Sequence, residues 1–386
     1  MKTEKGQALI LIAVGLVALL GLTALAIDGG NAFADRRHAQ NAADTSALSA
    51  ALSKISSQDW QQAALTRAAD NTYDNDGVSN TVTVHSPPIE GRYASDPNKN
   101  EYIQVIIVSR VDTWFARIVG VDHINNRVLA VARAKPAKPF YDGHSVVALS
   151  PGDGKNNTPE IKFYGSAVEV GVTGSGIFAN SSDGCAVDTS GSPDLTAPYI
   201  NSPGTVCGVS GITTGSGTQY PFPPDYSYLD DLCSKPNAVN INGDFPDSTI
   251  NSNTIYCISG DFKINGGNYS ATNVTFVIGG GVSISGNGTL NLKSPPNSPL
   301  FYLPYAASKV NNNKYTVTIN GNSDMELVGQ LLAPASHCKL NGTGATNPLS
   351  GQVICYTLEL GGNSDAVVIY NDIDNMDEPP QIELTQ

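Results

Sequence analysis

The chain has few of the side chains that usually carry out catalysis. Its 386 residues include five histidines and six cysteines, and no histidine stands beside a nucleophile motif. The sequence contains no G-x-S-x-G, Walker A or H-E-x-x-H pattern. We therefore expect no catalytic residue, no cofactor site and no metal site, and we expect that the protein is not an enzyme.

Three weaker patterns do not change this expectation. Residues 174–176 (Gly-Ser-Gly) lie in a Gly-rich turn region rather than at the start of a helix. Residues 70–77 resemble the beginning of a calcium-binding loop but lack the acidic residue that would close it, so a solvated helix end is favoured. Acidic residues before the two prolines at 379–380 predict a solvated tail over residues 373–386. These acidic residues are Asp372, Asp374, Asp377 and Glu378.

Positive charge is scarce in the second part of the chain. Residues 141–386 contain 8 Lys and Arg against 22 Asp and Glu, whereas residues 1–140 contain 14 and 13. An acidic surface repels phosphate groups, so we exclude nucleic acid as a partner.

Cysteine is absent from the first 184 residues, and all six cysteines follow. They are Cys185, Cys207, Cys233, Cys257, Cys338 and Cys355. No C-x-x-C pair occurs, which speaks against zinc and thioredoxin-type sites. An even number of cysteines in one region is typical of disulfides formed in an oxidising compartment. Six cysteines allow fifteen pairings, and we favour pairing in sequence order because each bridge then closes a loop of about twenty residues.

One long apolar run is present, from Ala8 to Ile27, and it contains no charge. At about 1.5 Å per residue it is long enough to cross a bilayer. Lys2 and Lys5 precede it, which favours an N-terminus inside the cytoplasm. We therefore predict a single-pass anchor of the cytoplasmic membrane over residues 1–30, with the rest of the chain outside the cytoplasm.

Two forms of N-terminal processing are alternatives to an intact anchor. One is a cleaved secretory signal that ends at residues 24–26 (Ala-Leu-Ala). The other is a prepilin-type leader cut after Gly6, which usually requires Glu at the fifth mature position, where this chain has Leu11. The uncleaved anchor is favoured.

The helix is expected to continue beyond the membrane, with Gly29-Gly30 as a flexible joint. Alanines recur at every fourth position and form one narrow apolar stripe. The stripe consists of Ala39, Ala43, Ala47 and Ala51. Small side chains permit close packing, either on the protein's own sheet or against neighbouring protomers in a pilus-like assembly. The first alternative is favoured.

Several parts of this N-terminal segment resemble the TadE/TadG-like family of Flp (tight adherence) pilus-assembly proteins. The resemblance rests on residues 6–9 (Gly-Gln-Ala-Leu), the apolar run, residues 28–30 (Asp-Gly-Gly), Arg36-Arg37 and residues 40–44 (Gln-Asn-Ala-Ala-Asp). It covers roughly the first 55 residues. It implies a membrane protein of a pilus-assembly or secretion system, without known catalysis.

Residues 31–138 are predicted to form a pilin-like α+β domain. The expected elements are helices at 59–69 and 112–119 and strands at 80–85, 101–111 and 127–134. Two prolines within residues 135–139 predict a linker.

Residues 139–372 are predicted to form an all-β, disulfide-bonded domain, because short β-prone runs alternate with Gly/Asn turns. A loose phrase recurs at residues 318–324, 339–344 and 359–365, and a repeat of about twenty residues suits one coil of a β-solenoid. A β-sandwich is the alternative.

Two classes of function remain. The first is a structural or assembly component of an Flp-type pilus, which contacts membrane lipid, other pilus-assembly or pilin-like proteins, and surface glycans. The second is a membrane-tethered carbohydrate-active enzyme, for which Asp230-Asp231 is the only adjacent Asp pair. A glycan-binding adhesin is a third possibility, which shades into the first and cannot be separated from it by sequence.

Overall fold

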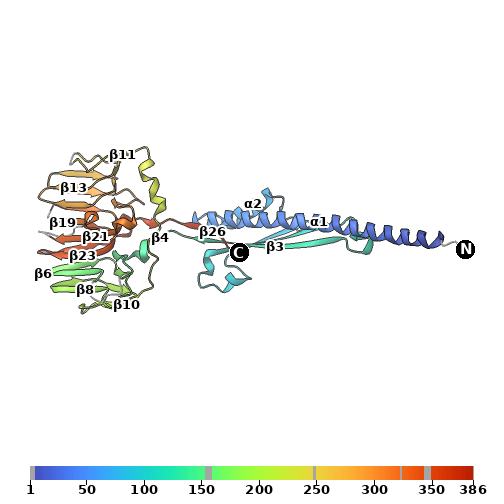
Figure 1. Cartoon of the computed structure of the whole chain (residues 1–386), viewed down its shortest axis with the longest axis horizontal. Helices are drawn as coiled ribbons and strands as arrows, with labels where there is room; N and C mark the ends of the chain where they lie inside the picture. Colours follow the sequence, from blue (N-terminus) through green and yellow to red (C-terminus); the bar gives the residue numbers. More distant parts are fainter. Residues whose placement is uncertain (1–4, 153–158, 247–248, 322–323, 343–348, 386) are drawn as a thin grey trace. The chain divides into compact units, whose positions relative to one another are not determined.

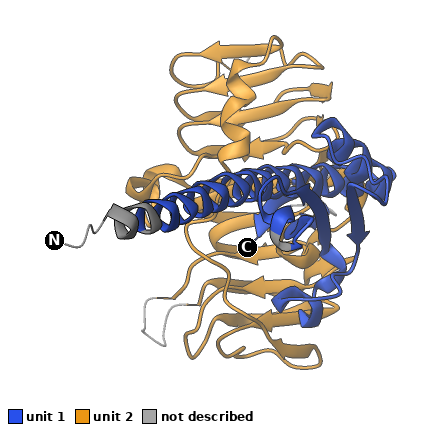
Figure 2. Ribbon diagram, turned by 90° about the vertical axis from the view of Figure 1, so that its right-hand side faces the viewer, with its two compact units in different colours: residues 1–137, 379–386 blue, residues 138–378 orange. Residues whose placement is uncertain are grey.

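The chain folds into two compact units, one of which is inserted into the other. The computed structural model describes residues 5–152, 159–246, 249–321, 324–342 and 349–385. Unit 1 comprises residues 1–137 and 379–386, and unit 2 comprises residues 138–378 (Figure 2). The division at 137/138 falls within the predicted linker.

Unit 1 begins with helix α1 (Lys5–Ile55), which has no break (Figure 1). The helix runs straight through Gly29 and Gly30, so these glycines do not interrupt it as the expected joint would. Within the described residues, α1 is the one helix long and apolar enough to cross a membrane, and only 6% of its most apolar stretch is buried. Leu11, Leu19 and Leu25 are each more than 60% exposed. Such a surface is costly in water and suits a lipid environment.

The second half of α1 packs on an antiparallel sheet. The sheet order is β1-β2-β3-β26. The elements of this unit are β1 (Asn80–His85), β2 (Tyr102–Asp112), β3 (His123–Lys135), β26 (Gln381–Thr385), α2 (Trp60–Asp70), and the short 3-10 helices at Arg92–Ser95, Lys99–Glu101 and Ala116–Val119. The Asp59 side chain caps α2 by accepting the Gln62 N–H at 3.0 Å. The helix expected over 112–119 is a single 3-10 turn at Ala116–Val119. The other helices and strands expected in residues 31–138 are present.

The segment predicted as an acidic tail contains a paired strand, although residues 381–384 are exposed. Gln381–Thr385 pairs with β3 as the fourth strand of the unit 1 sheet, with Ile382 opposite Ala134 and Leu384 opposite Ala132. Asp377–Glu378 (β25) pairs with Lys138–Pro139 (β4). The acidic residues between 372 and 378 suggested a solvated tail. Polar and apolar residues alternate from 381 to 385, however, and this period of two residues is typical of a strand.

Unit 2 consists of short strands in three parallel ladders. The first ladder contains, in spatial order, β11 (Ala238–Ile241), β12 (Ile255–Ile258), β15 (Thr275–Ile278), β18 (Phe301–Tyr302), β21 (Leu331–Gly342), β23 (Val353–Gly362), β5 (Val146–Ala148), β7 (Ile177–Ala179), β9 (Tyr199–Ser202) and β10 (Thr213–Ser216). The second ladder contains β13 (Phe262–Asn265), β16 (Val282–Ser285), β19 (Val317–Gly321), β21, β23, β6 (Ile161–Thr173) and β8 (Val187–Thr196).

The third ladder contains β14 (Tyr269–Thr272), β17 (Leu290–Lys293), β20 (Met325–Val328), β22 (Leu349–Ser350), β24 (Ala366–Ile369), β6 and β8. Short 3-10 turns connect them at Phe140–Gly143, Ser227–Ser234, Ala307–Lys309, Asn313–Tyr315 and Asp372–Asp374.

The order of strands in these ladders differs from their order in the sequence. The chain enters at β5, which pairs with β23, and residues 146–216 extend from there to β10 at one end. Residues 217–237 then cross to β11 at the other end, and residues 238–369 return to β23. Figure 1 shows β11 and β10 at opposite ends, with β21 and β23 between them. The first ladder strand to follow the entry into unit 2, β5, therefore lies in the middle of its ladder.

The three recurring phrases lie in register on neighbouring strands. Ile319 pairs with Leu340, and Leu340 pairs with Leu360. The same pairing joins the glycines at 321, 342 and 362. Each phrase therefore occupies the same place in successive turns of the chain.

Two apolar clusters stabilise unit 2. The larger lies inside the ladders and includes the fully buried Phe262, Phe276 and Phe301, whose neighbouring ring centroids are 4.6 and 5.4 Å apart. In the smaller cluster, Leu229 and Leu232 pack against side chains of the first ladder. Both leucines lie in residues 217–237, which we call the crossing segment. Burial of such side chains contributes roughly 1.5–3 kcal/mol each.

Candidate functional site

The residues that carried the family resemblance lie where α1 leaves its apolar stretch. Asp28 is the first charged residue after Ile27 and is only 5% exposed. Its carboxylate accepts backbone N–H groups from Trp114, Phe115 and Ala116 at 2.9, 3.0 and 2.7 Å. Asp28 thus fastens the β2–β3 loop to the helix.

A second polar group holds the next turns of α1. The Asn126 amide donates to the Ala32 carbonyl at 2.8 Å and to the Asp35 carboxylate at 2.7 Å. The Asp35 carboxylate also accepts the Ser109 hydroxyl and, at 3.2 Å, the Tyr73 hydroxyl. Burial raises the pKa of the Tyr73 phenol, and the negative charge of Asp35 adds to this effect. Because charge-assisted bonds of this kind are short and directional, they fix the rotation of the helix about its axis.

Gln40 adds a third attachment on the same helix. Its amide donates to the Asp44 carboxylate at 2.8 Å and to the Leu129 carbonyl of β3 at 3.1 Å. Asp28, Asp35, Gln40 and Asp44 are all part of the N-terminal pattern, or lie between its parts. The pattern therefore encodes the attachment of α1 to its own sheet.

The alanine stripe faces the same sheet. Ala39, Ala43, Ala47 and Ala51 are all fully buried, and they share one apolar cluster with β1, β2, β3 and α2. This is the first of the two packing alternatives that the sequence left open. Packing of these four alanines against neighbouring protomers does not occur in this arrangement, because the sheet occupies their surface.

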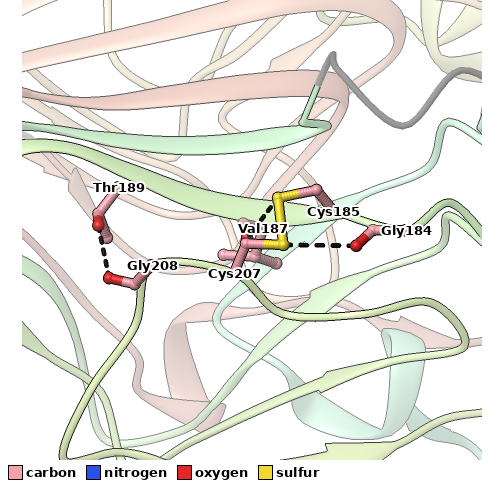
Figure 3. The surroundings of a disulfide bond; sticks show 6 residues. All are labelled: Gly184, Cys185, Val187, Thr189, Cys207 and Gly208. Atoms are coloured by element: carbon pink, nitrogen blue, oxygen red, sulfur yellow. Dashed lines mark hydrogen bonds between the residues drawn. A yellow bond between two sulfur atoms is a disulfide. The ribbon is translucent and has the colours of Figure 1, made fainter.

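The structure joins the six cysteines in sequence order. The pairs are Cys185–Cys207, Cys233–Cys257 and Cys338–Cys355, with Cα–Cα distances of 5.4, 5.9 and 6.1 Å. Figure 3 shows the first pair beside Val187, where the Thr189 hydroxyl donates to the Gly208 carbonyl at 2.6 Å. The second pair ties the crossing segment to β12, and the third joins β21 to β23. Of the three bridges, the third links two neighbouring strands of the ladders.

The other candidate residues are dispersed. Asp230 and Asp231 are both exposed on the 3-10 turn of the crossing segment. Asp76, in the calcium-like stretch, accepts the N–H groups of Val78, Ser79 and Asn80 and so forms the turn into β1. In the described ranges, no three His, Cys, Asp or Glu side chains gather as metal ligands would.

The β2–β3 loop is a feature that sequence reasoning missed. Trp114 is 74% and Ile118 83% exposed, and Phe115 and Val121 are also exposed. A short helix was expected over residues 112–119, with no expectation about the exposure of its apolar side chains. The sequence carries no local signal for this contact, because Asp28 and the loop residues that it binds are 86 to 88 positions apart.

Comparisons with known proteins agree with the N-terminal reading. Residues 6–53 match the family model described as "Putative Flp pilus-assembly TadE/G-like", which confirms the resemblance for this segment. No curated protein matches the chain. Among solved structures, the competence-associated pilin ComZ from Thermus thermophilus is similar over 81% of this chain and 90% of that one, with 10% identity. The TM-score of 0.26 is too low to support any statement about fold or function.

Proposed function

We propose that this protein is a membrane-anchored structural or assembly component of an Flp-type pilus or a related envelope secretion system, and that it acts by contact. The family match over residues 6–53 supports a pilus-related role. The observation that carries the proposal is that these same residues form an apolar helix attached by Asp28, Asp35 and Gln40 to a folded unit. Such an attachment couples a membrane segment to a domain and has no evident catalytic use.

The proposed topology places the N-terminus inside the cytoplasm and both units outside it. The support is the charge bias of Lys2 and Lys5 and the proximity of all six cysteines in pairs. Protease added to spheroplasts is expected to degrade both units and leave a short membrane-bound stub. Release of the units without protease would instead indicate a cleaved signal.

Oxidation of the cysteines gives an independent test of export. All six should resist alkylation in the native protein and react after a reductant is added. If the six thiols react without reductant, unit 2 does not reside in an oxidising compartment.

We further propose that unit 2 is a β-solenoid. The parallel pairing in all three ladders and the repeat of about twenty residues support stacked coils, whereas a sandwich is built mainly from antiparallel pairs. An experimental structure is expected to show neighbouring coils roughly 4.8 Å apart. Antiparallel pairing in that structure would favour the sandwich.

A direct test of contact against catalysis uses the full-length protein. Affinity purification under mild cross-linking should recover other pilus-assembly or pilin-like proteins. The proposal is wrong if the purified protein instead depolymerises a polysaccharide and loses that activity in D230N or D231N.

A further inference from the structure

We infer that the loop between β2 and β3 is a second membrane contact, inserted in the headgroup region of the bilayer beside α1. The inference rests on the proposed membrane anchor and extends it, because the helix would then not be the chain's single attachment to lipid. The loop comprises residues 113–122, between the last residue of β2 and the first of β3.

The first step is the position of the loop along α1. The Asp28 carboxylate holds the backbone of residues 114–116, and Asp28 directly follows the apolar run. When residues 8–27 cross the hydrocarbon core, Asp28 lies at its outer edge. The loop is therefore at the level of the lipid headgroups.

The second step is the chemistry of the loop surface. Trp114, Ile118 and Val121 are 74%, 83% and 45% exposed, and Phe33 on the adjoining turn of α1 is 64% exposed. Exposed apolar side chains at this density are unfavourable in water, and Trp in particular is enriched at membrane interfaces. The lipid bilayer is the occupant that continues the exposed apolar surface of α1.

The third step is the charge carried by the loop. Arg117 and Asp122 form an ion pair at 3.5 Å, and the nearby Arg110 and Asp112 form another at 3.7 Å. Each cation has an anion at close range, so the loop brings little net charge to the interface. Zwitterionic lipid is thus sufficient for its insertion.

The two tryptophans provide a probe and its control. Trp114 is in the loop, while Trp60 begins α2 after the end of α1, roughly 40 Å along the helix from Asp28. The W60F variant retains only the loop tryptophan, and W114F retains only the distant one. Both full-length variants are reconstituted in phosphatidylcholine vesicles brominated near the top of the acyl chains.

We expect the brominated lipid to lower the fluorescence of W60F about twofold and that of W114F hardly at all. In the W60F background, I118D should reduce the quenching, whereas L52D, at an exposed site far along α1, should leave it unchanged. The inference is overturned if the fluorescence of W60F is quenched by aqueous iodide but not by brominated lipid. It is also overturned if neither quenches the fluorescence, which would indicate that another protein copy covers the loop.

Resistance to carbonate extraction separates this inference from the proposed anchor. A protein that stays in the vesicles with an unquenched Trp114 contradicts the loop insertion alone. A protein that carbonate releases contradicts the anchor itself.

Discussion

At the scale of single residues, the polar side chains of α1 have a structural task. Asp28, Asp35 and Gln40 each bond to a segment more than seventy residues further along the chain. A buried carboxylate is stable only when donors replace the water that it loses. These residues therefore define where along the helix, and at which rotation, the sheet is attached.

Replacing Asp28 with Ala should destabilise unit 1 by about 1–3 kcal/mol, because three N–H groups lose their acceptor in a partly buried place. Denaturant unfolding of the full-length protein in detergent measures this loss. The matched control is D112A, which removes an exposed carboxylate near the same loop and should cost less than about 1 kcal/mol. Equal effects of the two variants would argue against a special role of Asp28.

Asp76 should make unit 1 sensitive to acid. Backbone N–H bonds to the carboxylate lower its pKa to about 2. A carboxyl group with a depressed folded-state pKa stabilises the fold above its unfolded pKa of about 3.9, and this contribution is lost as the pH falls through the folded value. The stability of unit 1 should therefore decrease between about pH 4 and pH 2. D76N should show a shallower decrease, and an unchanged pH profile in D76N would contradict this.

At the scale of elements, α1 combines an exposed apolar half with a buried alanine half. Helices α1 and α2 and strands β1, β2 and β3 could be predicted, because their periodicity is a property of short stretches. The protein's own sheet was the favoured partner of the alanine stripe, but the pattern alone did not decide it, since a small-residue stripe looks the same whether a sheet or another helix covers it. The Asp28–loop contact was likewise invisible, because it joins residues 86 to 88 positions apart.

Filling the stripe with A43L should destabilise unit 1 by about 1–3 kcal/mol, because the larger side chain meets the sheet. The unfolding of a monomer in detergent measures this directly. The control is N41L, at an exposed position of the same helix. Normal stability of A43L together with loss of assembly would show that the stripe contacts neighbouring protomers instead.

At the scale of the whole molecule, unit 2 is an insertion between two paired strands of unit 1. Lys135 lies opposite Gln381, so β3 and β26 could be joined by a short turn. The insertion could not be predicted, because the pairing of β5 with β23 and of β3 with β26 depends on contacts over most of the chain. The disulfide-rich β region and its boundary near residue 138 could be predicted, because the amino-acid composition changes there.

Replacing residues 138–378 with a short Gly-rich turn should leave unit 1 folded and membrane-bound. Its sheet retains all four strands, and the contacts of Asp28 and the alanine stripe are untouched. Circular dichroism tests whether unit 1 is folded, and carbonate extraction tests whether it stays in the membrane. Adherence or partner capture should be lost in the same variant. A control truncated after residue 137 also lacks β26 and should be less stable. An unfolded insertion-deleted variant would show that unit 1 depends on unit 2.

The insertion also constrains the order in which the strands can find their partners as the chain emerges. The Thr385 hydroxyl bonds to Val131, 254 positions earlier, and the Gln352 amide bonds to the Phe140 carbonyl, 212 positions earlier. If the residues after α1 emerge in sequence order, β3 has no partner on its β26 side until the final residues have emerged. The middle strands of the unit 2 ladders, β21 and β5, likewise lack a partner until β23 arrives. If both units are exported as proposed, the chain passes through an incompletely paired state, whose exposed strand edges would need protection from aggregation.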